Sequence, residues 1–109
     1  MTSNDAVVVV ATIQAAEGSE DKVEQALRAA IPAVHAEPGC LRYALHRDLR
    51  SPGTFVMIEK WASAEALGVH GKGAALRELG AALDGLLSKP LSVQTLTALP
   101  EGDGDLGRL

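Results

Sequence analysis

The hydrophobic pattern at the start of the chain predicts a buried strand followed by an amphipathic helix. Residues 6–15 are almost continuously apolar and rich in β-branched Val, which is typical of a strand covered on both faces. Apolar residues then recur with helical spacing behind Ser19, a candidate N-cap. Pro32 is expected to bend or end the last turns, and a Pro-Gly pair ending at Gly39 stops the helix.

Two further strands, joined by a turn, are predicted next. Residues 40–47 alternate between apolar and polar side chains, the pattern of a half-exposed strand. A Pro-Gly pair within residues 50–53 predicts the turn. Residues 54–61 are apolar on both alternating faces, apart from Glu59 and Lys60, so this segment is again predicted to be a central strand.

The remaining pattern predicts two helices and a last strand. Ser63 can cap a short helix that runs from Ala64 to about His70. A final strand is expected at residues 91–99. Between these segments lies a longer helix, whose apolar stripe consists of Leu76, Leu79, Leu83, Leu86 and Leu87.

The element order β-α-β-β-α-α-β predicts an α+β, ferredoxin-like split βαβ fold, with a four-stranded antiparallel sheet and the helices on one face. This topology places the first and third strands in the middle of the sheet, and these are the strands with two apolar faces. The face without helices would expose Val8, Val10, Val56 and Ile58 to water. Burying this patch against a second copy is favourable, so we expect a homodimer through the sheet face.

Length and composition indicate one domain. The 109 residues are enough for one core and a modest pocket. We expect the folded domain to span residues 6–99, between a flexible N-terminus at 1–5 and a flexible, Gly- and Asp-rich tail at 100–109. The N-terminal residues show no secretory-signal pattern, and the single Cys fits a reducing compartment, so we expect a cytoplasmic protein.

The charge balance excludes some classes of partner. The net charge is −4 and there is no basic cluster, which argues against nucleic acid as a partner. An acidic chain without a long apolar run also gives no reason to expect a membrane partner. No pair of His, Cys, Asp and Glu shows metal-ligand spacing, so no metal site is expected.

Two residues are candidates for catalysis. His70 could take a phenolic proton near neutral pH, because the reference pKa of His is about 6.5; the alternative is a His that caps or packs a helix end. Glu59 lies on a mostly apolar strand face and could act as a base or orient a ligand. Its alternative role is a structural ion pair, either with Arg42 or across a dimer.

Other side chains are candidates for binding a substrate. Arg42 could pair with an anionic substrate oxygen or could simply lie on the surface. An apolar wall for an aromatic ligand would be formed by Tyr43, Phe55, Met57 and Trp61, although these residues could equally be plain core.

Three short motifs occur in a recognisable order: Glu37-Pro38-Gly39-Cys40, Glu59-Lys60-Trp61, and Ala66-Leu67 followed by His70. In this order and spacing they resemble the antibiotic-biosynthesis monooxygenase family over residues 6–99. The resemblance implies a ferredoxin-like α+β domain that dimerises through its sheets into a dimeric α+β barrel. It also implies an activity, since members include cofactor-free oxygenases of phenols and quinols.

The leading functional prediction is therefore a monooxygenase that acts without a cofactor on a phenolic or quinol-like aromatic small molecule, with His70 as the base. Two alternatives stay open. One is a non-catalytic dimer that binds a small molecule. The other is a proton-transfer enzyme on the same fold, such as a lactone isomerase.

Overall fold

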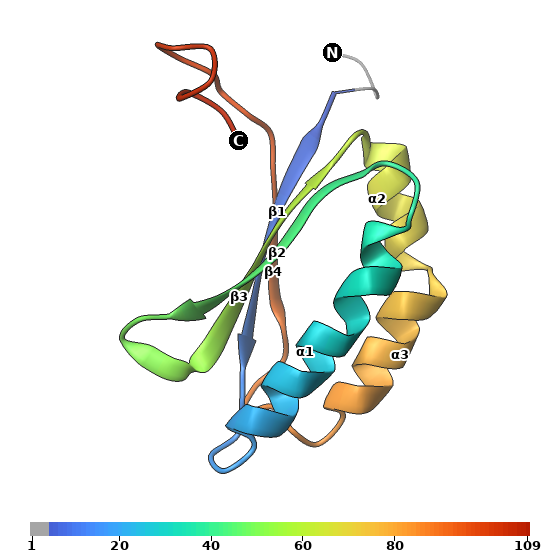
Figure 1. Ribbon diagram of the computed structural model, residues 1–109, viewed down its shortest axis with the longest axis vertical. Helices are drawn as coiled ribbons and strands as arrows, with labels where there is room; N and C mark the ends of the chain where they lie inside the picture. The colour runs from blue at the N-terminus through green and yellow to red at the C-terminus, as the bar shows by residue number, and fades with distance from the viewer. Residues whose placement is uncertain (1–4) are drawn as a thin grey trace.

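The computed structural model describes residues 5–109, which form a four-stranded antiparallel sheet and three helices (Figure 1). The expected flexible N-terminus at residues 1–5 lies outside the described part except for Asp5. The elements follow the predicted order: β1 (Val7–Gln14), α1 (Glu20–His35), β2 (Cys40–Asp48), β3 (Ser51–Trp61), α2 (Ala64–Gly71), α3 (Ala74–Leu83) and β4 (Ser92–Leu96).

The sheet has the strand order β2-β3-β1-β4, so β1 and β3 are central, as their two apolar faces predicted. The helices lie together on one side of it (Figure 1). The register pairs Val9 with Glu59 on β3 and with Thr95 on β4, which directs these three residues to the helical side. This arrangement confirms the predicted ferredoxin-like α+β fold.

The core lies between the helices and the odd-numbered positions of the two central strands. Its largest fully buried side chains are those of Trp61, Phe55, Leu27, Met57, Val23 and Val34. On the other side of the sheet, Val10, Val56 and Ile58 are half-buried in the single chain. They are three of the four residues that the sequence assigned to a dimer interface; the fourth, Val8, is already buried in the single chain, with 9% of its surface exposed.

Three local predictions agree with the structure only in part. The hairpin turns at Leu49 and Arg50 rather than at residues 50–53, because Asp48 pairs with Ser51 and its carboxylate accepts a 2.8 Å hydrogen bond from the Arg50 backbone. Pro32 lies within α1, which continues to His35. Ser19 is the N-cap of α1, as expected, but its side chain makes no hydrogen bond to the helix.

The end of the chain also differs from the prediction. Helix α3 ends at Leu83, because Asp84 leaves the helical conformation with a ψ of 126°, so Leu86 and Leu87 pack on the core from the loop that follows. Strand β4 is shorter than the expected residues 91–99. Residues 100–109 contain no helix or strand; the carbonyl of Leu109 accepts a 2.5 Å hydrogen bond from Lys60 Nζ.

Within residues 5–109, no helix has the length and apolar character needed to cross a membrane.

Candidate functional site

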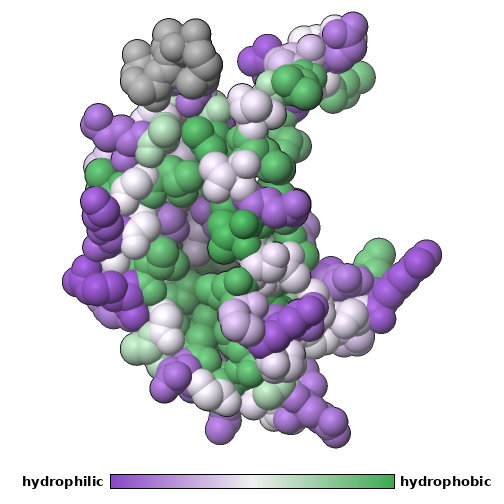
Figure 2. Space-filling view, turned by 180° about the vertical axis from the view of Figure 1, so that it is seen from behind, coloured by the Kyte–Doolittle hydropathy of each residue, from purple (hydrophilic) through white to green (hydrophobic). Residues whose placement is uncertain are grey.

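A cavity of about 310 Å³ lies between the helical layer and the sheet. Figure 2 views the molecule from behind relative to Figure 1 and shows apolar side chains gathered over the middle of that face. The described residues that line the cavity come from both layers: Val9, Ala11, Ile13, Leu27, Tyr43, Met57, Glu59, Leu67, His70, Gly71, Leu76, Leu79, Leu83, Leu91, Val93 and Thr95. Its walls are therefore mainly aliphatic, and its few polar groups come from β2, β3, β4 and α2.

Local packing fixes helix α2, which carries His70. The Ser63 hydroxyl accepts a 3.1 Å hydrogen bond from the backbone of Ala66, and so caps the helix. Gly39 lies directly against the helix: a Cβ built on Gly39 would stand only 2.5 Å from the Cβ of Ala66. Gly39 also has a φ of 83°, a conformation that favours glycine. The bend before β2 thus lets α2 approach the sheet closely enough to bury His70.

The imidazole of His70 is held on three sides. Its ring is stacked on the indole of Trp61, with ring centroids 4.4 Å apart and an angle of 29° between the planes. Tyr43 meets it edge-on at 5.7 Å between centroids. Nδ1 lies 2.8 Å from Oε1 of Glu37. With 4% of its surface exposed, His70 has one orientation fixed by packing and by a carboxylate.

The second ring nitrogen of His70 remains available. A carboxylate accepts hydrogen bonds, so in the neutral form of His70 the contact with Glu37 places the proton on Nδ1 and leaves a lone pair on Nε2. Nε2 has no hydrogen-bond partner within residues 5–109. Every side-chain nitrogen or oxygen that is fully buried in that range does have a partner, so Nε2 is not fully buried. Nε2 therefore keeps accessible surface, and the surface that His70 lines is the cavity.

Glu59 lies beside this pair on β3 and is 5% exposed. Its Oε1 accepts a 2.9 Å hydrogen bond from Trp61 Nε1. Burial raises the pKa of Glu59, while the Trp61 hydrogen bond and His70 partly oppose this change. The other oxygen has no partner among the described residues, so by the same reasoning it too keeps accessible surface.

The Tyr43 side chain completes the polar end of the cavity. Burial raises the pKa of its phenol well above the usual range, and the Glu59 and Glu37 carboxylates raise it further. Tyr43 is therefore a neutral phenol across the physiological pH range. Met57 lines the cavity on the strand beside Tyr43.

The structure brings four of the seven predicted site residues to this cavity, namely His70, Glu59, Tyr43 and Met57. It does not bring the other three to the lining. Trp61 is fully buried behind His70. Arg42 lies after a bulge in β2, outside the cavity, where its guanidinium donates to the Leu41 carbonyl.

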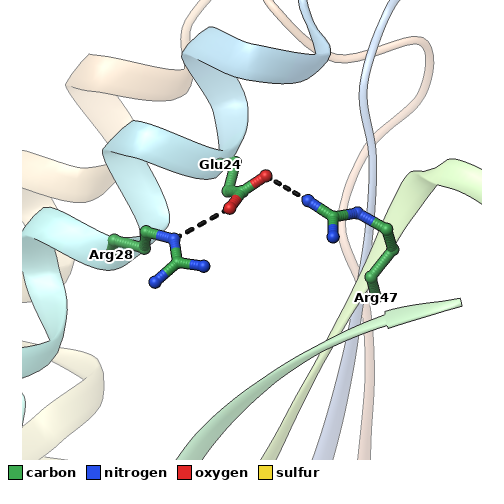
Figure 3. Close-up of polar contacts among 3 residues, drawn as sticks. All are labelled: Glu24, Arg28 and Arg47. Carbon is green, nitrogen blue, oxygen red and sulfur yellow. Dashed lines mark hydrogen bonds and ion pairs between the residues drawn. The ribbon is translucent and has the colours of Figure 1, made fainter.

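Phe55 lies at another hollow, between α1 and β2. The guanidinium of Arg47 stands 5.5 Å from the centre of its ring. Arg47 also forms an ion pair with Glu24 of α1, which Arg28 binds from the other side (Figure 3). The Glu24–Arg47 ion pair links α1 to β2 beside this hollow.

Glu37 is the functional candidate that the sequence analysis missed. In the sequence it stands only as the first residue of the first of the three motifs, with no sign of a partner. Its carboxylate lies 33 residues from His70 in sequence but binds its imidazole directly. The described residues contain no group of three or more His, Cys, Asp and Glu side chains suited to holding a metal ion.

Comparison with known proteins gives consistent results. Residues 6–82 match the sequence model of the family described as antibiotic biosynthesis monooxygenase. The structure is similar to PA3566 from Pseudomonas aeruginosa, with 31% identity, a TM-score of 0.82 and coverage of 91% of this chain and 99% of that one. It is also similar to Rv0793 from Mycobacterium tuberculosis, with 27% identity, a TM-score of 0.83 and coverage of 91% and 100%.

A Caulobacter crescentus protein described as a candidate antibiotic biosynthesis monooxygenase is a third similar structure. It shows 28% identity and a TM-score of 0.82, with coverage of 89% of this chain and 92% of that one. Among curated proteins, no relative matches the sequence.

Proposed function

The chain belongs to the antibiotic biosynthesis monooxygenase family, and from this membership we propose that it is a cofactor-independent monooxygenase of a phenolic or quinol-like aromatic small molecule. One observation carries the proposal. A buried His70, oriented by Glu37, offers an unprotonated nitrogen to an otherwise mainly aliphatic cavity. This combination suits the removal of a proton from a hydroxyl group on an apolar ring.

In the proposed reaction, His70 Nε2 takes the proton of the bound hydroxyl, and the Glu37 carboxylate stabilises the imidazolium that forms. The aryl oxide transfers one electron to dioxygen, which gives an aryloxyl radical and superoxide. These combine at a ring carbon that bears hydrogen, and the new peroxide takes its proton back from His70. Loss of the C–H proton and cleavage of the O–O bond release water and leave a quinone carbonyl.

The neighbouring side chains have supporting roles in this proposal. The free oxygen of Glu59 accepts a hydrogen bond from the substrate, and the Trp61 N–H holds the carboxyl in place. Tyr43 and Met57 contact the substrate ring. A mainly aliphatic wall strengthens these polar contacts, because the local dielectric is low.

Oxygen uptake tests the proposal. The purified protein is expected to consume dioxygen with at least one member of a panel of hydroquinones and hydroxylated polycyclic phenols, and to form the quinone. Turnover that persists without oxygen would indicate a proton-transfer enzyme instead. Ligand binding in a thermal-shift assay without oxygen uptake across the panel would indicate a non-catalytic binding protein.

We also propose that the chain forms a homodimer through the open face of its sheet. Val10, Val56 and Ile58 lie there on the two central strands, on the side away from the helices. Light scattering is expected to give about twice the chain mass of 11.3 kDa. Ile58→Lys should shift the protein towards monomer, whereas Val69→Lys, on an exposed position of α2, should not. A wild-type monomer at micromolar concentration would contradict the proposal.

A further inference from the structure

The charges around the cavity are strongly one-sided. Among the described residues that line it, none is Lys or Arg, and Glu59 is the acidic member. Glu37 lies directly behind His70, so a second carboxylate is close to the same end of the cavity. An anionic ligand would lie against the Glu59 carboxylate and near that of Glu37 in a place of low dielectric, and the lining offers no Lys or Arg to neutralise it.

Two hydrogen-bond acceptors at the same end of the cavity have no donor bound to them. The free oxygen of Glu59 and the lone pair of His70 Nε2 have no hydrogen-bond partner in residues 5–109. A ligand that excludes water from them must supply donors, because a buried acceptor without a partner is costly. A hydroxyl group does this, whereas a carboxylate or a bare hydrocarbon does not.

The other end of the cavity is suited to a hydrocarbon body. Aliphatic side chains from both layers line it: Ile13, Leu27, Leu76, Leu79, Leu83 and Val93. The volume of about 310 Å³ is at the small end of the range of roughly 300–1,000 Å³ for small-molecule pockets. A compact ring system with its polar group at one end matches this division.

We propose that Glu59 makes the cavity selective for uncharged ligands with a hydroxyl donor, and that it rejects anions of the same shape. Glu59 is thus a determinant of specificity in addition to any part it has in the reaction. The inference rests on the proposed function only for the choice of this cavity as the binding site. The expected preference for a neutral hydroxylated ring over a carboxylated ring follows from the charges and the hydrogen-bond acceptors of the cavity lining.

Two probes of the same skeleton test the inference: 2-naphthol, which is uncharged, and 2-naphthoate, which is an anion. Isothermal titration calorimetry at about pH 8 keeps 2-naphthoate ionised and, because burial raises the pKa of Glu59, favours the ionised form of that side chain more than a lower pH would. Wild-type protein is expected to bind 2-naphthol at least about tenfold more tightly than 2-naphthoate, because like charges in a buried site repel strongly. Glu59→Gln keeps the size of the side chain and should reduce this ratio about tenfold or more, mainly by improving 2-naphthoate binding.

Glu78→Gln is the matched control, since Glu78 is exposed on α3 and does not line the cavity. It should leave both affinities unchanged. Equal affinities of the wild-type protein for the two probes, no binding of either, or an unchanged ratio in Glu59→Gln would each overturn the inference. Selectivity without oxygen uptake would refute only the proposed reaction, and oxygen uptake without selectivity would refute only the role of Glu59.

Discussion

Replacing His70 with Gln is expected to lower turnover by about 10²–10⁴-fold, the usual contribution of a general acid–base residue. Gln has a similar length and keeps an N–H group that can donate to Glu37, but it cannot accept and return a proton. The contact with Glu37 and the packing on Trp61 should therefore survive in large part. Initial rates of oxygen uptake measure the effect, once a substrate from the phenol panel is in hand.

His46→Gln is the matched control for this substitution. His46 lies exposed on β2, where its Nδ1 contacts the carbonyl of Ala44, and it does not line the cavity. The same chemical change there should leave the rate unaltered. If His70→Gln kept the wild-type rate while melting at a lower temperature, His70 would have a structural role and the proposed base would be wrong.

The sequence predicted the fold well because its signals are local and periodic. Two apolar faces identified β1 and β3 as the central strands, and the order of elements then left few topologies. The errors lie where a local pattern competes with a tertiary contact. Leu86 and Leu87 continue the apolar stripe of α3, yet the backbone leaves the helix at Asp84 and packs these residues from a loop.

The candidate site was less accessible to sequence reasoning. Strand alternation places Phe55, Met57, Glu59 and Trp61 on one face but cannot say which of them reaches a cavity. Helix α2 decides this for Trp61, because His70 stacks over the indole and covers it, whereas Phe55 lies at the hollow between α1 and β2. The link between Glu37 and His70 depends on how closely the bend and α2 approach each other, which no periodicity reveals.

That close approach leads to the last prediction, the replacement of Gly39 with Ala. Both Gly39 and Gly18 have positive φ angles, of 83° and 87°, so Ala costs about 1–2 kcal/mol in backbone strain at either position. Of these two positions, only residue 39 would place the added Cβ of an Ala against another residue. Overpacking of this kind costs a further 1–3 kcal/mol or so. Gly39→Ala should therefore lower the melting temperature by several degrees more than Gly18→Ala.

A second substitution separates the clash from the strain. The Cβ of Ala66 is the atom that a side chain at residue 39 would meet at 2.5 Å, so Ala66→Gly should recover much of the additional loss in the double variant. Equal losses at Gly39 and Gly18 would show that α2 does not press on the bend. In that case the position of His70 would depend on its contacts with Trp61, Tyr43 and Glu37 alone. A larger loss at Gly39, reversed by Ala66→Gly, would instead show that a glycine at this bend sets the depth at which the imidazole is buried.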